Sequence, residues 1–420
     1  MRQAVLPMLH SLFSTLSLAG KSLLNRRATA LLTVMSIAVS VALLSAVERV
    51  RTDAQTSFSN TISGTDLIIG ARSGELNLLL YSVFRIGSPT NSISWKSFEE
   101  ISERREVAWT IPLSLGDAHR GFRVVGTNTD YFEHYRYADK RLLEFSSGRG
   151  FVAATDAVIG AEVAATLGYV VGDSIVVSHG LGNVSFVTHD DNPFSVSGIL
   201  APTGTPVDRS VHVSLEGIDV MHGIDVPDGD VSDSNYAPQD ITAALVGLNS
   251  RVAIFTLQRF INEYETEPLM AVIPGVALQQ LWGLIGVAET ALFGVSAMVV
   301  LAGVLGLLTT LLVSLNERRR EMAVLRSVGA RPAHVFILLL TEAAILGLAG
   351  GLSGLALVQM AVIAARSWAQ TEVGIQLGIG FRPFDLYILA GIVVLSVVTS
   401  CIPAWRAYRN SLADGLTVRV

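Results

Sequence analysis

The sequence predicts an α-helical membrane protein with four transmembrane helices and a large α+β domain between the first two. Half of its 420 residues are hydrophobic and only 16% are charged, which is too apolar for an ordinary soluble enzyme. Residues 48–282 carry 16 Lys+Arg and 29 Asp+Glu, a net charge of −13. The first 47 residues, the 316–334 loop and the tail from Arg406 hold 12 Lys+Arg and 3 acidic residues. Basic and acidic parts therefore lie on opposite sides of a membrane.

Four apolar runs have the length of membrane spans, which need roughly 20 apolar residues each. These runs are residues 28–47, 284–315, 335–365 and 386–404. Lys21, Arg26 and Arg27 precede the first run, so the positive-inside rule places the N-terminus in the cytoplasm. Because the number of spans is even, the 405–420 tail returns to the same side, as does the basic 316–334 loop.

The N-terminal run also has the basic flank of a signal peptide. It is long for the apolar part of one, and no convincing small-x-small cleavage site follows it. We therefore expect an uncleaved span. Upstream, residues 1–27 space their leucines as in an amphipathic helix on the cytoplasmic membrane surface.

The exported segment, residues 48–282, mixes two patterns without a detectable repeat. Strand-like stretches are "TDLIIG", "FRVVG", "DSIVVS", "FSVSGIL", "RSVHVSL" and "TAALVGL", and helical ones are "WKSFEEISERR", "GAEVAATLG" and "SRVAIFTLQRFINEY". This mixture predicts an α+β domain. We expect a membrane-proximal part at about 48–111 and 241–282 and a distal part at about 112–240. The acidic stretch 225–240 reads as a surface loop.

No motif for nucleotide binding or hydrolysis is evident. "TLSLAGKS", residues 15–22, ends like a P-loop, but Thr15 stands where that motif needs glycine, and no strand precedes it. The G-x-S-x-G elbow of hydrolases is absent from the sequence. We expect no catalytic residue, no bound cofactor and no nucleic-acid partner for this chain.

Histidines outside the spans are weak candidates for metal ligands. They are His119, His134, His179, His189, His212 and His222. His179, His189, Asp190 and Asp191 are close in sequence, yet no H-E-x-x-H or similarly tight spacing occurs. We predict no metal site, and we interpret His212 as a sheet residue.

Two features mark the third span. Glu342 is a carboxylate within an apolar run, where a charge is costly and often functional. The alternative that we favour is a structural acid near the cytoplasmic face, paired with an arginine of the preceding loop. Four glycines in small-xxx-small spacing permit close helix approach, within the bundle or across a dimer. They are Gly347, Gly350, Gly351 and Gly354.

The 316–334 loop has the pattern of a short helix, a turn and a new helix. Met322, Leu325 and Val328 form an apolar stripe, and opposite charges at i,i+3 favour a helix. Gly329 is placed to end that helix and Pro332 to begin the next. A topology marker alone needs none of this. The pattern thus favours a docking element that transmits force into the third span.

The same stretch, "NERRREMAVLRSVGARPAHVFILLLTEA", resembles the signature of FtsX-like/MacB-like ABC transporter permeases. The matching positions are Glu317, Arg318, Glu321, Met322, Leu325, Arg326, Ser327, Gly329, Ala330 and Glu342. The tail "IPAWRAYRNSLADGL" is similar to the closing motif of that family, with Ser411-Leu412 where many members have Asp-Pro. "VIGAEVAATLGYVVGDSIVVS" and "FSVSGILAPTGTPVDRSVHVSL" resemble the MacB-type periplasmic core domain.

This resemblance implies a non-enzymatic permease subunit in the bacterial inner membrane, with both termini in the cytoplasm. Such permeases dimerise, as homodimers or related heterodimers, and pair with separate ABC ATPase subunits that bind ATP and Mg. The coupling helix that enters the ATPase would then use Glu317, Arg318, Glu321, Met322, Leu325, Arg326, Gly329 and Ala330. Conformational change would pass through the spans to the periplasmic domain, and a periplasmic adaptor or substrate protein is a further possible partner.

Three functions stay open at this point. One is export or extraction of a peptide, lipid, lipoprotein or hydrophobic compound. A second is mechanical regulation of a periplasmic partner such as a cell-wall hydrolase, although regulators of that kind usually have a smaller exported domain. A third is metal-linked transport through the periplasmic histidines.

Overall fold

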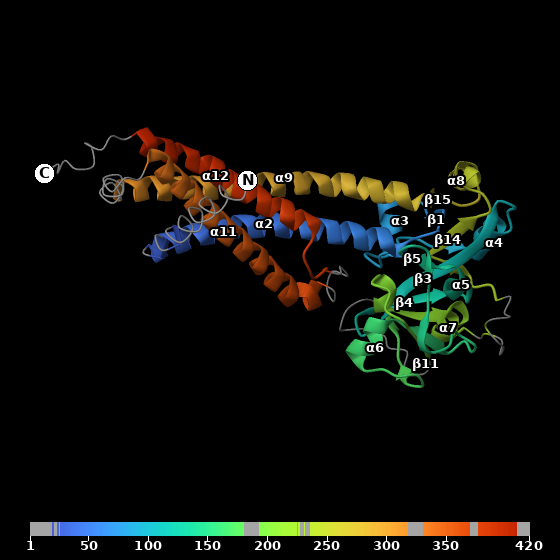
Figure 1. Cartoon of the computed structure of the whole chain (residues 1–420). Coiled ribbons are helices and arrows are strands. Elements are labelled where there is room, and N and C mark those ends of the chain that lie inside the picture. The colour runs from blue at the N-terminus through green and yellow to red at the C-terminus, as the bar shows by residue number, and fades with distance from the viewer. Residues whose placement is uncertain are drawn as a thin grey trace, which may run out of the picture. The chain divides into compact units, whose positions relative to one another are not determined.

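The computed structural model of the chain describes residues 19–20, 23–24, 26–179, 193–224, 226, 231, 236–317, 331–369 and 377–409. These residues belong to two compact units (Figure 1). The helical unit comprises residues 1–53, 287–373 and 377–420, and the sheet unit comprises residues 54–286 and 374–376. We describe each unit by itself.

Among the described residues, four long helices are apolar enough to cross a membrane, and each contains one predicted span. They are α2 (Arg27–Thr61), α9 (Pro274–Glu317), α11 (Pro332–Trp368) and α12 (Pro383–Arg409). The prediction of four spans is confirmed, although α2 and α9 extend well beyond the apolar runs, through polar residues that also form helix. Large apolar side chains stay exposed on these helices, among them Leu32 and Met298. A bilayer supplies the apolar surroundings that such side chains need.

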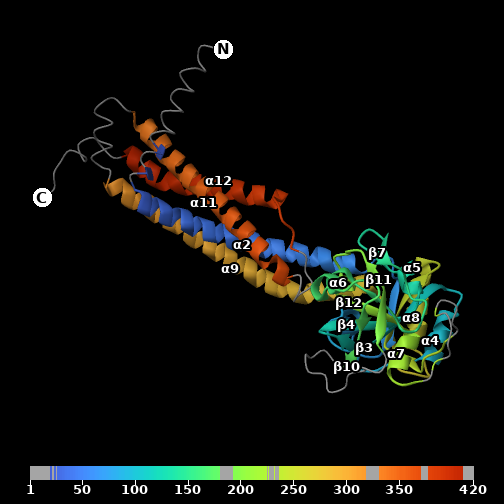
Figure 2. The same cartoon turned by 90° about the horizontal axis from the view of Figure 1, so that it is seen from below.

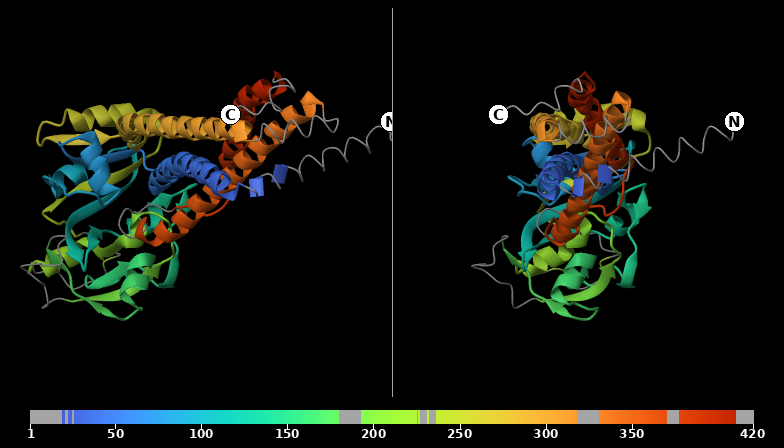
Figure 3. Two further views of the ribbon diagram at one scale, coloured as in Figure 1. Left: turned by 90° about the vertical axis from the view of Figure 1, so that its left-hand side faces the viewer. Right: turned by 60° about the vertical axis from the view of Figure 1, so that its left-hand side comes forward.

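Within the helical unit, α2 and α9 run side by side, and α11 packs against α12 (Figures 2 and 3). An apolar cluster joins three of the helices through Ile37 and Val41 of α2, Leu355 of α11 and Ile392 of α12. A second cluster joins α9 to α11 through Leu311 and Ala343. Small and medium apolar side chains thus carry the packing of this unit.

The sheet unit is built on a mixed sheet in the order β15-β1-β14-β3-β4-β12-β8-β11-β7, with β10 paired to β3 and β9 to β11. Its strands are β1 (Leu67–Ala71), β3 (Val107–His119), β4 (Phe122–Thr127), β7 (Phe145–Gly148), β8 (Asp156–Ile159), β9 (Ser174–Ile175), β10 (Ser178–His179), β11 (Phe194–Leu200), β12 (Ser210–Ser214), β14 (Ala243–Leu248) and β15 (Leu269–Val272). Two further pairs are β2 (Ile93–Ser94) with β13 (Asp240–Ile241), and β5 (Arg136–Tyr137) with β6 (Arg141–Leu142). The α-helices are α3 (Glu75–Ser82), α4 (Trp95–Ser102), α5 (Asp130–His134), α6 (Ala161–Leu167), α7 (Leu215–Met221) and α8 (Ile254–Asn262).

Strand β3 joins the two parts of this sheet. Its first half pairs with β14, where Leu113 faces Ala243, and its second half pairs with β4, where Ser114 faces Gly126. The predicted boundary between proximal and distal parts, at residue 112, falls inside this continuous strand. Sequence patterning missed β3, although large apolar residues recur at every second position from Val107 to Leu115, because Pro112 within the run argues against a central strand. The domain boundaries themselves stay predictions.

Successive side chains of each strand point to opposite faces of the sheet, so the core residues form clusters on two faces. On β1, Leu67 and Ile69 pack with Leu257 of α8, whereas Ile68 points to the opposite face and packs with Leu78 of α3. On β12, Val211 and Val213 likewise join the cluster under α6 and α7. The middle residue of β12 is His212, which lies among the aromatic rings of the other face.

Most of the segments that were predicted to be strands or helices have that secondary structure. The described part of the unit is the α+β fold that was predicted, with "DSIVVS" as the weakest match. That segment yields only β9 and β10, because its start pairs with β11 and its end pairs with β3.

Candidate functional site

The segment expected to couple to an ATPase lies almost wholly outside the described residues. Helix α9 ends at Glu317, and α11 begins at Pro332, after Arg331 in extended conformation. Pro332 therefore occupies the first turn of a helix, as predicted. The remaining coupling residues are not described: Arg318, Glu321, Met322, Leu325, Arg326, Gly329 and Ala330. Their role stays a prediction.

The four glycines of α11 face two different neighbours in the same chain. A Cβ added at Gly347 would lie 2.6 Å from Ser396 Oγ, and one at Gly351 would lie 2.6 Å from Leu389 Cδ1, both on α12. A Cβ at Gly350 would lie 2.6 Å from Ile37 of α2, and one at Gly354 would lie 2.6 Å from the Ala38 carbonyl. The glycine pairs thus allow close approach within the bundle, which is one of the two predicted uses.

Helices α2 and α9 also approach each other closely at a glycine, and here hydroxyl groups take part in the contact. A Cβ at Gly303 would lie 2.9 Å from Ser40 Oγ, and that hydroxyl donates to the carbonyl of Val299 at 3.0 Å. About two helix turns away, Thr33 Oγ1 of α2 donates to Thr310 Oγ1 of α9 at 3.2 Å. Interhelical hydroxyl hydrogen bonds of this kind orient membrane helices at modest energy.

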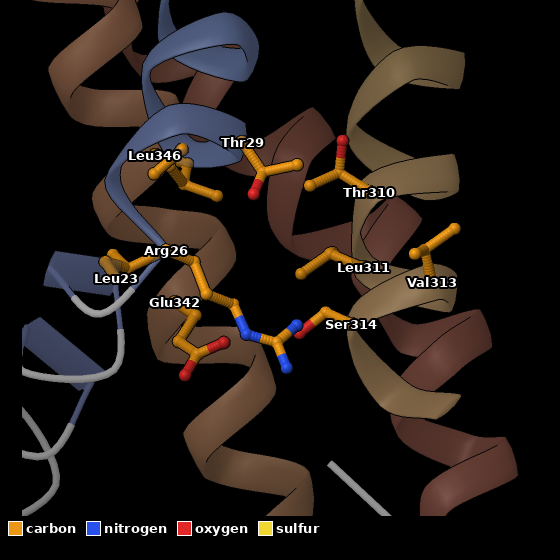
Figure 4. A pocket seen from close by; sticks show the side chains of 10 residues that line it. Leu23, Arg26, Thr29, Thr310, Leu311, Val313, Ser314, Glu342 and Leu346 are labelled. Atoms are coloured by element: carbon orange, nitrogen blue, oxygen red, sulfur yellow. The ribbon is translucent and has the colours of Figure 1, made fainter. Parts of the chain in front are cut away.

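Glu342 lines a pocket of the helical unit, which we call the Glu342 pocket. Its lining residues are Leu23, Arg26, Thr29, Ala30, Thr310, Leu311, Val313, Ser314, Glu342 and Leu346. The side chains of Arg26 and Glu342 both point into it (Figure 4). Glu342 is only 2% exposed, and the cavity measures about 70 Å³, enough to hold water.

The favoured partner for Glu342 was an arginine of the 316–334 loop. Apart from Arg331, the arginines of that loop lie outside the described residues. Arg26, from the basic flank before the first span, instead shares the pocket with Glu342. A basic residue noted in the sequence as a topology signal therefore also supplies polar lining for a buried acid.

A second polar cluster, which we call the Asp385 cluster, was missed. Asp385 at the start of α12 accepts from Arg49 Nη2 of α2 at 2.6 Å, and the two side chains are 2% and 4% exposed. Its other oxygen, Oδ1, accepts from Ser45 Oγ at 3.0 Å. Arg49 Nη1 donates to Gln359 of α11 at 2.9 Å, and Nη2 also reaches the carbonyl of Gly380 at 3.0 Å. This ion pair and the hydrogen bond to Gln359 together thus join three of the long helices.

Further charges extend this cluster. Arg382 Nη2 lies 2.6 Å from Asp53 Oδ1, and Arg51 of α2 pairs with Glu289 of α9 at 3.1 Å. The four apolar runs themselves hold no charged residues besides Glu289 and Glu342. Arg49 stands two residues after the first run and Asp385 one residue before the fourth, and packing of the helix ends against each other buries them.

Histidines of the sheet unit have mainly structural surroundings. His212 is fully buried, and its Nδ1 lies 3.3 Å from the carbonyl of Val158. Burial, with a contribution from Arg85, lowers the pKa of His212 to about 3. His119 contacts the Val176 carbonyl and Tyr169 Oη, and burial lowers its pKa as well. Our interpretation of His212 as a sheet residue is confirmed.

The metal cluster considered from sequence, at residues 179–191, is described only at His179, which pairs in β10 with Asp117. The structure brings together a different set: Asp130, Glu133 and His134 on α5. The expectation that no tight ligand spacing occurs near the histidines was wrong, since these three residues lie within five positions of the chain. The i, i+3, i+4 spacing on a helix is the signal that identifies it.

Two family descriptions match the sequence in succession. Residues 29–258 match the MacB-like periplasmic core domain, and residues 293–412 match the FtsX-like permease C-terminal family. Together they extend over most of both units.

Individual relatives are distant. The chain is 24% identical over 408 residues to the macrolide export ATP-binding/permease protein MacB of Nitrobacter winogradskyi, covering 92% of this chain and 57% of that protein. It is 26% identical over 348 residues to the pyoverdine export ATP-binding/permease protein PvdT of Pseudomonas syringae pv. tomato, covering 79% of this chain and 49% of that protein. The chain thus spans about half the length of the curated relatives it matches. The periplasmic region of MacB from Actinobacillus actinomycetemcomitans aligns with a TM-score of 0.34 at 12% identity, over 53% of this chain and 94% of that one.

Proposed function

Because the chain belongs to the family with a MacB-like periplasmic core domain, followed here by an FtsX-like permease region, we propose that it is the permease subunit of an ABC exporter. The ATPase of this exporter is a separate subunit that binds ATP and Mg. The observation that carries the proposal is the succession of the two family matches, which follows the order of span, exported domain and three further spans. ATP hydrolysis by the partner changes the conformation of the periplasmic domain and thereby drives export.

Helix α11 is suited to transmit such a change. It begins at Pro332, directly after the coupling segment, and Gln359 near its other end reaches the Asp385 cluster. Between these points its glycines bring α2 and α12 into backbone-close contact. Helices in backbone-close contact transmit strain, because the contact itself leaves little room to absorb a displacement. A displacement of residues 317–330 would therefore move α2, α11 and α12 together.

Export is favoured over mechanical regulation by the names of the relatives, which are macrolide and pyoverdine exporters. For this chain we propose a substrate handled on the periplasmic side: a peptide, lipid, lipoprotein or hydrophobic compound. A second copy of the permease, as a homodimer or related heterodimer, completes the complex. Both ends of the chain lie in the cytoplasm.

Copurification in mild detergent followed by ATPase assays tests this function. We expect an ABC ATPase to copurify, and we expect Leu325→Asp and Glu321→Lys to abolish permease-dependent stimulation of ATP turnover. Leu325→Met, which conserves volume and apolarity, is the matched control and should behave as the native chain. Intact complexes with normal stimulated turnover in both charge variants would refute the coupling assignment. A copurifying cell-wall hydrolase activated only with ATP would replace export by regulation.

A further inference from the structure

Three metal-ligating side chains gather on the short helix α5 of the sheet unit. The ligand atoms of Asp130, Glu133 and His134 all lie within 4.8 Å of one another. Their i, i+3 and i+4 spacing places them on one helix face. Asp130 and His134 are half-buried and Glu133 is exposed, so an ion from solvent has access to all three.

The histidine of this set is held against the sheet. The His134 imidazole stacks on the Trp109 indole of β3, with 5.4 Å between ring centroids and 2° between ring planes. The indole in turn lies over Gly247 of β14, where an added Cβ would be 2.1 Å from the indole ring. Stacking on a ring that is itself seated on the sheet limits the orientations of the imidazole. A ligand oriented before binding loses less freedom when a metal arrives.

The negative charge of the set is not neutralised by any described side chain. No ion pair between described residues includes Asp130 or Glu133. The basic residue nearest along the chain, Arg136, donates to the backbone carbonyls of Glu133 and Tyr135 instead. Two carboxylates this close repel each other unless a cation lies between them.

We propose that Asp130, Glu133 and His134 bind a first-row divalent cation of the Zn²⁺ type. One imidazole nitrogen with two carboxylates suits Zn²⁺, Ni²⁺ or Cu²⁺ better than Ca²⁺ or Mg²⁺, which prefer oxygen ligands throughout. Three protein ligands leave a coordination position open, as in zinc sites that bind substrate. Water or a donor atom of a bound molecule would fill this position. This inference does not depend on the proposed export function.

Zinc titration of the full chain tests the site. Detergent-purified protein is stripped of metal and titrated calorimetrically with ZnCl₂ alone. We expect saturable binding of one ion per chain, weakened at least about tenfold by His134→Asn and by Glu133→Gln. His222→Asn, at an exposed histidine of the same unit, and His189→Asn, from the cluster considered earlier, should leave this binding unchanged.

A second readout locates the ion. Cu²⁺ bound at His134 would quench the fluorescence of the stacked Trp109, and this quenching should disappear in Trp109→Phe and in Glu133→Gln. Thermal unfolding without metal shows whether each variant folds. Zinc binding that is unchanged in the α5 variants, or lost only with His189→Asn, would overturn the proposal. Binding that never saturates would mean an adventitious ion only, and would overturn it equally.

Discussion

The helical unit and the sheet unit bury ionisable groups in opposite ways. In the helical unit, the buried side chains of Arg49 and Asp385 form an ion pair across α2 and α12. In the sheet unit, His212 is buried beside Tyr131 and Phe132, and its Nε2 has no partner among the described residues. Its lowered pKa keeps the ring neutral. The stability of the first arrangement depends on the partner side chain, whereas the stability of the second depends on pH.

Removing one charge of the buried pair should have the largest effect. Asp385→Asn leaves the Arg49 guanidinium without its counter-charge, and breaking a buried pair from one side costs about 3–5 kcal/mol. We expect a large drop in the thermal unfolding temperature of the detergent-solubilised chain. The double variant with Arg49→Gln should recover part of this loss.

The control for that experiment is Glu289→Gln. Glu289 pairs with Arg51 where both side chains are partly exposed, 22% and 40%, and such pairs contribute at most about 1 kcal/mol. Equal decreases in unfolding temperature for Asp385→Asn and Glu289→Gln would show that the buried Arg49–Asp385 pair stabilises the chain no more than a partly exposed pair does.

The second-largest loss of stability should come from adding a methyl group where a glycine of α11 contacts a neighbouring helix. In Gly354→Ala the new Cβ would lie 2.6 Å from the Ala38 carbonyl and 2.8 Å from Val41 Cβ, so α2 must shift. Overpacking of this kind costs about 1–3 kcal/mol. Gly391→Ala is the matched control on α12, where nothing lies within 4 Å of an added Cβ. The prediction fails if both alanine variants unfold at the same temperature.

The sheet unit should respond to acid through His212. Its folded pKa of about 3 is lower than the unfolded value of about 6.5. The unfolded chain therefore binds more protons, so stability is full above pH 6.5 and falls as pH decreases toward 3. At pH 5 the loss amounts to about 2 kcal/mol.

In His212→Gln, unfolding followed by intrinsic fluorescence should show a shallower pH dependence between 6.5 and 5 than in the native chain. An unchanged slope would mean that other groups produce the acid sensitivity.

The smallest effect concerns the hydroxyl pair between α2 and α9. Thr310→Val removes the bond from Thr33, and interhelical bonds in membranes average about 0.6 kcal/mol. We expect a decrease in unfolding temperature near the limit of detection. A loss as large as that of Asp385→Asn would contradict the view that α2 and α9 are held mainly by apolar packing.

Much of the fold was predictable from the sequence, since span length, basic flanks and strand alternation are local signals. The glycines of α11 were recognisable too, because their four-residue spacing is visible in the chain. Their assignment to two different helices was not, because it depends on how α2 and α12 pack around α11. Arg49 and Asp385 lie 336 positions apart, and no local pattern joins them.

The candidate sites divide in the same way. Glu342 was evident as an acid in an apolar run, whereas its pocket with Arg26 required the tertiary structure. His134 was noted only as one of several histidines. Its stacking on Trp109, from a strand that patterning missed, distinguishes it from the others.

The central claim is that residues 317–330 bind to an ATPase subunit, and photo-crosslinking tests this claim most directly. With p-benzoylphenylalanine at Met322, on the apolar stripe, irradiation of the membrane-embedded complex should link the chain to the ATPase. The same probe at Met360, an exposed apolar position of α11, should give no such product. An intact complex without a crosslink from Met322, or with equal crosslinking from both positions, would contradict the account.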